Sequence, residues 1–211
     1  VEIAATKPFD EGMQRERDIF VKCRDSEQSK AQRHLFFAER EAAKVKDVPR
    51  DTQKRPINTA AVVGCGTMGG GIAMCLANVG IPVTVLEMTA DALAVGMAKI
   101  EKNYAATVSK GRLSQNAMDR RMGLITGTTM YADLGAADIV IEAVFEDMDL
   151  KKTIFGELDK VMKPGAVLAT NTSTLDIDEI AAATKRPADV IGTHFFSPAN
   201  VMKLMENVRG K

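Results

Sequence analysis

The sequence predicts an α/β protein built on a doubly wound parallel sheet, with a helical extension at its N-terminus. Three observations carry this prediction. A glycine-rich turn joins a short apolar run to a helix-like segment, and strand-like and helix-like segments alternate after it. The first 56 residues are more heavily charged than the rest. We therefore divide the chain into residues 1–56, a helical linker, and residues 57–211, a nucleotide-binding domain.

The glycine-rich turn has the sequence GCGTMG and follows an apolar run at residues 60–63. Gly64 permits a tight turn, Gly66 lets the backbone approach a pyrophosphate, and Gly69 lets the next helix pack closely on the strand. That helix points its N-terminus at the turn, where free N–H groups and the helix dipole attract a phosphate. The pattern is typical of a Rossmann-type dinucleotide-binding unit.

The helix after the turn has one apolar face, at the spacing i, i+3, i+4, i+7: Ile72, Cys75, Leu76 and Val79. Residues 82–86 are predicted to form the second strand, with Glu87 at its carboxyl end. A carboxylate there accepts hydrogen bonds from ribose hydroxyls and repels a 2′-phosphate, so we expect NAD rather than NADP. The alternative is a glycine-rich turn without a ligand.

Composition argues against several function classes. Lys plus Arg and Asp plus Glu balance at 28 each, so no overall field recruits nucleic acid or an anionic membrane. No apolar run reaches the roughly 18 residues needed to span a bilayer, and no signal-peptide pattern opens the chain, so we expect a soluble protein. The three cysteines lack CxxC spacing, which indicates reduced thiols and no metal site. We interpret Cys65, inside the glycine turn, as a small filler residue.

Residues 1–56 are predicted to form one or two helices with a narrow apolar stripe: Leu35, Ala38, Ala42 and Val45. Phe36 and Phe37 are the expected docking residues, and His34 is expected to be a surface histidine. We interpret this segment as a connector to another domain; the alternative is a solvated terminal helix. Two prolines among charges mark residues 48–58 as the linker.

The remaining elements alternate along the chain. Helices are expected at 91–108, 114–122, 154–162 and 176–183, and strands at 124–129, 138–143, 166–170 and 190–193. Asp176 and Glu179 have the spacing of a capping box. A basic cluster on the first of these helices and in the turn after it is either a solvated face or a phosphate site: Lys99, Lys102, Lys110 and Arg112.

The turns that follow the strands should meet at one edge of the sheet, because the carboxyl ends of parallel strands align. Among them only His194, in HFFSP, has a side chain of the type that exchanges a proton near neutral pH. Glu206 could hold its second ring nitrogen if residues 201–205 return past it as an extended segment. Asn171 and Ser173, in NTSTL, could orient a substrate oxygen and a nicotinamide. A structural histidine is the alternative.

Four segments, GCGTMG, VIEAVFEDMDLKK, TNTSTLDIDEIA and IGTHFFSPANVMKLMEN, resemble the NAD-binding domain of L-3-hydroxyacyl-CoA dehydrogenases. They most resemble multifunctional fatty acid β-oxidation enzymes, in which an enoyl-CoA hydratase/isomerase domain precedes the dehydrogenase. The resemblance covers roughly residues 57–208. It implies that His194 is the general base, Glu206 its partner, and Ser173 the contact to the substrate hydroxyl.

The resemblance also implies which residues bind ligands. Coenzyme A contacts are implied at Asn103 and Lys110, in addition to the substrate contact of Ser173. The implied NAD-binding residues follow the same edge of the sheet: Gly64, Gly66, Thr67, Met68, Gly69, Glu87, Ala143, Glu146, Lys151 and Asn171. No metal is expected.

The implied activity is NAD-dependent oxidation of L-3-hydroxyacyl-CoA to 3-ketoacyl-CoA. Family members complete the acyl-CoA cleft with a C-terminal helical domain, and residues 1–56 resemble the tail of a hydratase domain without its acid pair. We therefore expect a fragment of a larger enzyme, with those two domains and acyl-CoA as its partners and with little turnover on its own. The resemblance leaves a homodimer open. The expected location is the bacterial cytoplasm, with the peroxisomal matrix as the alternative.

Two other functions stay open. One is a single-function 3-hydroxybutyryl-CoA dehydrogenase, although Ser197 stands where those enzymes commonly read HFFNP. The other is a non-catalytic NAD-binding structural protein on the same scaffold, since a fold does not fix a function.

Overall fold

The computed structural model describes residues 2–42, 44–49 and 51–211, and the chain divides into two compact units, Val1–Lys54 and Arg55–Lys211. The predicted helical positions Val1 and Ala43, and the predicted linker position Arg50, lie outside the described residues.

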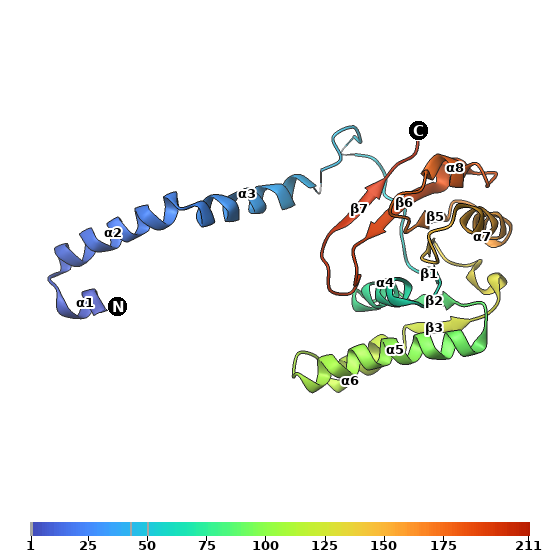
Figure 1. Ribbon diagram of the computed structural model, residues 1–211, viewed down its shortest axis with the longest axis horizontal. Helices are drawn as coiled ribbons and strands as arrows, with labels where there is room; N and C mark the ends of the chain where they lie inside the picture. The colour runs from blue at the N-terminus through green and yellow to red at the C-terminus, as the bar shows by residue number, and fades with distance from the viewer. Residues whose placement is uncertain (1, 43, 50) are drawn as a thin grey trace. The chain divides into compact units, whose positions relative to one another are not determined.

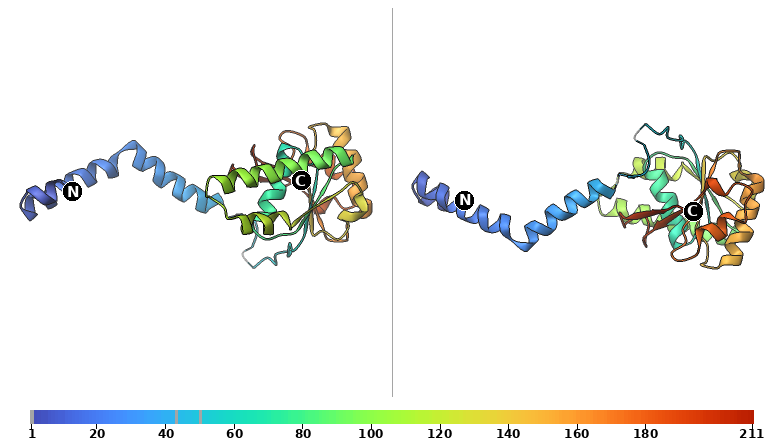
Figure 2. Two further views of the ribbon diagram at one scale, coloured as in Figure 1. Left: turned by 90° about the horizontal axis from the view of Figure 1, so that it is seen from below. Right: turned by 90° about the horizontal axis from the view of Figure 1, so that it is seen from above.

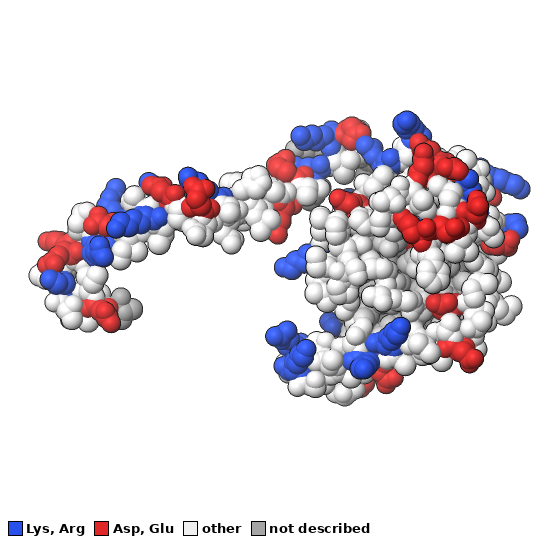
Figure 3. Space-filling model, viewed as in Figure 1, with Lys and Arg blue, Asp and Glu red and all other residues white. Residues whose placement is uncertain are grey.

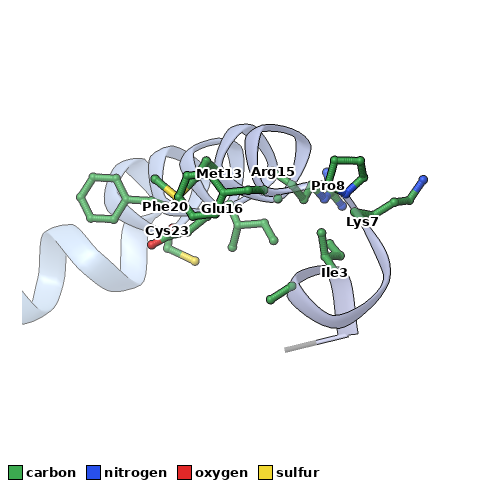
Figure 4. Close-up of a pocket in the computed structure, with 12 residues that line it drawn as sticks. Ile3, Lys7, Pro8, Met13, Arg15, Glu16, Phe20 and Cys23 are labelled. Atoms are coloured by element: carbon green, nitrogen blue, oxygen red, sulfur yellow. The ribbon is translucent and has the colours of Figure 1, made fainter.

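The described part of the first unit contains three helices rather than one or two: α1 (Glu2–Thr6), α2 (Phe9–Asp25) and α3 (Glu27–Ala42). None of their described residues is buried. The residues of the predicted narrow stripe are exposed, and Val45 lies beyond the end of α3. Figure 4 shows an apolar groove of about 570 Å³ on α1 and α2, lined by side chains such as Met13 and Phe20.

The second unit is built on one seven-stranded sheet with the order β3-β2-β1-β4-β5-β6-β7 (Figure 1). β1 to β6 are parallel, and β7 runs antiparallel to β6. The first six positions follow the doubly wound order of a dinucleotide-binding sheet, so the predicted fold class is confirmed. The strands are Ala60–Val63, Val83–Leu86, Ile125–Thr128, Ile139–Glu142, Val167–Thr170, Val190–Phe195 and Met205–Val208.

Helices cover both faces of this sheet (Figure 2). One face carries α4 (Thr67–Asn78), α5 (Ala90–Ser109) and α6 (Gln115–Met122). The other carries η1 (Tyr131–Leu134), α7 (Met148–Val161) and α8 (Ile177–Ala181), and η2 (Pro187–Asp189) leads into β6. Alternate residues of β1 enter the two apolar layers, as a strand covered on both faces requires.

Two local predictions are wrong. α4 ends at Asn78, and Val79 is 73% exposed, so Val79 is not part of the buried face. Ile72 is buried as predicted, and Ala73 and Ala77 are buried beside it. The capping box at α8 is only half formed: the Asp176 carboxylate accepts a hydrogen bond from the backbone N–H of Asp178, but Glu179 pairs with Lys152 of α7. A nearby cation therefore replaces the backbone contact expected of Glu179.

The carboxyl edge of the sheet is aligned by its register. Val63 of β1 lies opposite Glu142 of β4, which lies opposite Thr170 of β5. Thr170 in turn pairs with Gly192, so β6 continues beyond this line and carries His194 past the edge. The polar turns therefore converge where the sequence predicted.

Among the residues that the structure describes, no helix has the length and apolar character needed to cross a membrane. No group of three or more His, Cys, Asp or Glu side chains within residues 2–42, 44–49 and 51–211 is placed to hold a metal ion.

Candidate active site

His194 and Glu206 face each other across the β6–β7 ladder. They are directly paired in register, and Nδ1 of His194 lies 2.8 Å from Oε2 of Glu206. The return strand starts at Met205, not at residue 201 as predicted, and the preceding residues form a loop. Because an ionised carboxylate can only accept, Nδ1 is the donor, and in the neutral imidazole Nε2 then keeps a lone pair for a proton. The imidazole ring also contacts Phe196, with ring centroids 4.7 Å apart.

A hydrogen bond of Asn171 links the turn after β5 to the end of β6. Its side-chain Oδ1 accepts a hydrogen bond of 2.8 Å from the backbone N–H of Phe195, next to His194. The amide predicted to orient a nicotinamide is therefore partly engaged in fixing the strand that carries the imidazole.

Glu146 organises the turn that carries Ser173. One oxygen of its carboxylate accepts hydrogen bonds from the Thr172 hydroxyl at 2.6 Å and from the backbone N–H groups of Ser173 and Thr174 at 2.7 and 3.1 Å. Partial burial opposes ionisation of this carboxyl, but these three bonds and the Lys151 charge together lower the pKa of Glu146 below its ordinary value. Ser173 itself is exposed at this edge.

Lys151 is buried, with only 1% of its side chain exposed, and it pairs with Glu142, which has none exposed. The ammonium donates to both carboxylate oxygens, at 2.7 and 2.9 Å, and its Nζ lies 3.5 Å from Oε2 of Glu146. Lys151, which the resemblance implied as an NAD-binding residue, thus approaches Glu146 from the interior of the protein. The sequence analysis assigned no role to Glu142. The one signal that could have found it is the presence of an acid in the apolar run DIVIEA.

The glycine turn fits the diphosphate of a dinucleotide. Gly64 has φ +97°, and a Cβ on Gly69 would lie 1.9 Å from the Gly64 carbonyl oxygen, so neither position accepts a side chain. A Cβ on Gly66 would meet no atom within 4 Å, which leaves open space in front of the turn. Gly66 also caps α4 without any side-chain hydrogen bond, so the first N–H groups of the helix, at Thr67 and Met68, face that space.

Glu87 lies against the same turn. One carboxylate oxygen accepts the Cys65 N–H at 2.6 Å and the other the Met88 N–H at 3.2 Å, and each oxygen keeps a lone pair for a hydroxyl. The side chain of Cys65 is buried against Gly96, and burial, with the Glu87 charge adding to it, raises the pKa of the thiol to about 11. Cys65 is therefore the neutral filler residue that was predicted. Ala143 lies beside the turn, with its carbonyl oxygen next to Gly64.

A cavity of about 310 Å³ lies between the N-terminus of α4, α5 and the loop after β6. Thr67, Lys99 and Asn103 line it, so the predicted substrate residue Asn103 is near the glycine turn. Lys110 follows the last turn of α5 and is not among the residues that line this cavity. Figure 3 shows Lys and Arg side chains gathered over α5 and α6, where the sequence placed a basic cluster.

The fold and the edge residues define a class of protein: a Rossmann-type dinucleotide-binding domain with a carboxylate-braced imidazole at the carboxyl edge of its sheet. The model of one family, the NAD-binding domain of 3-hydroxyacyl-CoA dehydrogenase, matches residues 59–211. The chain belongs to this family, and its cofactor is NAD.

Curated relatives match almost the whole chain. The peroxisomal bifunctional enzyme of Cavia porcellus is 44% identical over 98% of this chain and 29% of that protein. A peroxisomal fatty acid beta-oxidation multifunctional protein of Oryza sativa is 40% identical over 94% of this chain and 27% of that protein. The chain therefore spans less than a third of the length of these relatives.

Solved structures share the fold of the second unit. The (S)-3-hydroxybutyryl-CoA dehydrogenase of Ralstonia eutropha is 39% identical, with a TM-score of 0.72 over 74% of this chain and 55% of that chain.

Proposed function

We propose that this chain is the NAD-binding part of an enzyme that oxidises L-3-hydroxyacyl-CoA to 3-ketoacyl-CoA in fatty acid β-oxidation. The observation that carries the proposal is the His194–Glu206 pair, 2.8 Å apart, at the edge where the glycine turn also opens. The matched family and the multifunctional relatives support it.

In this proposal each edge residue has one role. Nε2 of His194 takes the proton from the 3-hydroxyl, because Nδ1 is already bound to Glu206. Glu206 fixes the tautomer and stabilises the imidazolium that forms. Ser173 orients the substrate oxygen. NAD⁺, when bound, supplies the acceptor for the hydride that leaves C3.

The cofactor residues divide between the two ends of the edge. The glycine turn with Thr67 and Met68 holds the diphosphate, and Glu87 accepts from the adenosine ribose. Glu146, Asn171 and Ala143 form the nicotinamide end, and Lys151, whose side chain is only 1% exposed, acts there through Glu146. Asn103 lines a cavity that it shares with Gly66 and Thr67 of the diphosphate site, and we assign its amide a contact to coenzyme A. A contact from Lys110 needs a ligand that extends past the end of α5.

A single-function 3-hydroxybutyryl-CoA dehydrogenase is the second candidate, since one is the structural neighbour above. The coverage favours the multifunctional enzyme: that neighbour matches 74% of this chain, whereas the two multifunctional relatives named above match 98% and 94%. Their match includes α1 to α3, which supports the connector interpretation of residues 1–56 as the tail of a hydratase-like domain.

The test uses the complete enzyme and measures NADH formation from an L-3-hydroxyacyl-CoA. We expect His194→Ala to lower kcat by about 10²- to 10⁴-fold, the usual contribution of a positioned acid–base group, with NADH affinity almost unchanged. The other histidine offers a matched control, because His34 is exposed on α3. His34→Ala should keep full activity. Near-normal turnover by the His194 variant would refute the proposal.

We further propose that the enzyme acts in the peroxisomal matrix, because relatives that match nearly the whole chain are peroxisomal by name. This is the alternative, not the first, of the two predicted locations. A fluorescent fusion of the complete reading frame should co-localise with a peroxisomal marker, and a purely cytoplasmic signal would contradict this location. The homodimer stays a prediction, which sedimentation of the complete enzyme would test.

A further inference from the structure

The buried carboxylate of Glu142 is fully hydrogen-bonded, and its main partner is the ammonium of Lys151. The Glu142 carboxylate accepts two bonds from Lys151, one of 2.8 Å from the backbone N–H of Val144 and one of 2.6 Å from the Thr170 hydroxyl. These donors come from three places: α7, β5 and the loop after β4. Burying two charges costs several kcal/mol, which only such a complete set of bonds repays. Neither side chain is exposed enough to meet a ligand directly.

The ammonium of Lys151 has one further neighbour, Glu146. Oε2 of Glu146 lies 3.5 Å from the ammonium, whereas Oε1 accepts all three bonds from the turn that carries Ser173. The two oxygens of one carboxylate thus face in two directions. One meets the fixed interior charge, and the other meets the exposed turn.

We propose that the Glu142–Lys151 pair is a positioning element: it fixes Glu146, and through Glu146 it fixes the backbone turn that presents Ser173. The effect on catalysis rests on the proposed function, in which Ser173 orients the substrate hydroxyl. A displacement of about 1 Å at such a group can cost about 10²-fold in rate.

The first test replaces both charges at once, in the variant Glu142→Leu/Lys151→Met. Exchange of a buried ion pair for apolar side chains of similar volume is often neutral for stability, so the fold is expected to survive. Amide hydrogen exchange, followed by NMR on this chain, should become at least about tenfold faster at Ser173 and Thr174 and stay unchanged at Val62 of β1. Unchanged exchange at Ser173 and Thr174 would overturn the proposal.

The control removes an exposed pair from the same helix. Glu157→Leu/Lys160→Met makes the same exchange at an i, i+3 pair on α7 whose side chains are 44% and 67% exposed. It should leave exchange at Ser173 and Thr174 unchanged. Equal acceleration in this control would show a general loosening of α7, which contradicts a specific positioning role.

Two single variants cover the case in which the double variant does not fold. Lys151→Gln keeps a donor for Glu142 but removes the charge that faces Glu146, and Glu146→Gln keeps the acceptor and removes its charge. Each should accelerate exchange at Ser173 and Thr174, and the two together should add little, because they act in series. Fully additive effects would overturn the proposal.

The catalytic consequence is measured separately, in the complete enzyme. Glu142→Leu/Lys151→Met, or Lys151→Gln in its place, should lower kcat by about 10- to 100-fold with NADH affinity kept, and unchanged kcat would overturn this part of the proposal. Failure of the proposed function is distinguishable, because His194→Ala would then also leave NADH formation unchanged. The exchange experiment decides the positioning role in either case.

Discussion

Two pairs of acidic and basic side chains stand at the same edge of the sheet, and they are built in opposite ways. Glu142 and Lys151 are sealed, with 0% and 1% of their side chains exposed. His194 and Glu206 are open, with 22% and 53% exposed, and Nε2 of the imidazole is left for a proton. A sealed pair can hold neighbouring groups but cannot meet a substrate, whereas an open pair can react but adds little to stability. At this edge, the buried pair therefore positions neighbouring groups, and the exposed pair is available to react.

The largest expected effect comes from a substitution that breaks the sealed pair. Lys151→Met leaves the Glu142 carboxylate buried without its cation, which should lower the free energy of unfolding by about 3–5 kcal/mol. Urea denaturation of this chain measures the loss. Lys160→Met, which removes an exposed partner from the same helix, should cost less than about 1 kcal/mol. Equal losses in the two variants would remove the distinction between sealed and open pairs.

A smaller effect is expected at the open pair. Glu206→Gln should change the free energy of unfolding by less than about 1 kcal/mol, because this carboxylate is exposed. In the complete enzyme it should lower kcat by roughly tenfold or more, since a neutral amide stabilises the imidazolium less well. Glu179→Gln, at an exposed glutamate of α8, is the control for both measurements. A Glu206 variant that loses stability but not turnover would reverse the roles assigned to the two pairs.

The smallest effect concerns a third pair, at the amino end of β4. The Lys163 ammonium and the backbone N–H groups of Thr59 and Asn58 lower the pKa of Asp138 from 3.8 to about 2. Because the folded-state pKa is the lower one, this stabilisation is complete above about pH 4 and is lost as the pH falls through about 2.

Urea unfolding between about pH 5 and pH 2 should show this loss in the wild type and a weaker pH dependence in Asp138→Asn. Lys163 itself is half-exposed, so the pair is expected to be screened by salt. Identical pH profiles for the two proteins would show that Asp138 does not contribute to acid unfolding.

The sequence predicted best what is local. The strand, turn and helix around GCGTMG were readable because each glycine meets a need set by its neighbours, and the structure shows those needs at Gly64 and Gly69. The alternation of segments also predicted the sheet and the edge at which the polar turns meet. Val79 was misplaced because helix periodicity does not say where a helix ends.

The sequence could not predict which residues far apart in the chain pair with each other. β7 is exposed along its whole length, so no apolar pattern marked the strand that brings Glu206 to His194. The Glu142–Lys151 pair joins the end of a strand to a helix nine residues later, and neither residue's type specifies that partner. Three of the bonds that fix Glu146 come from a turn more than 25 residues further along the chain. Such contacts follow from the fold and not from spacing.

The central claim is that Glu206 holds the imidazole of His194 so that Nε2 is the free proton acceptor. The ¹⁵N chemical shifts of the His194 ring, measured by NMR on this chain just above neutral pH, test it directly. We expect a protonated Nδ1 and an unprotonated Nε2, and we expect Glu206→Gln to weaken that preference. A ring that carries its proton on Nε2 in the wild type would contradict the account.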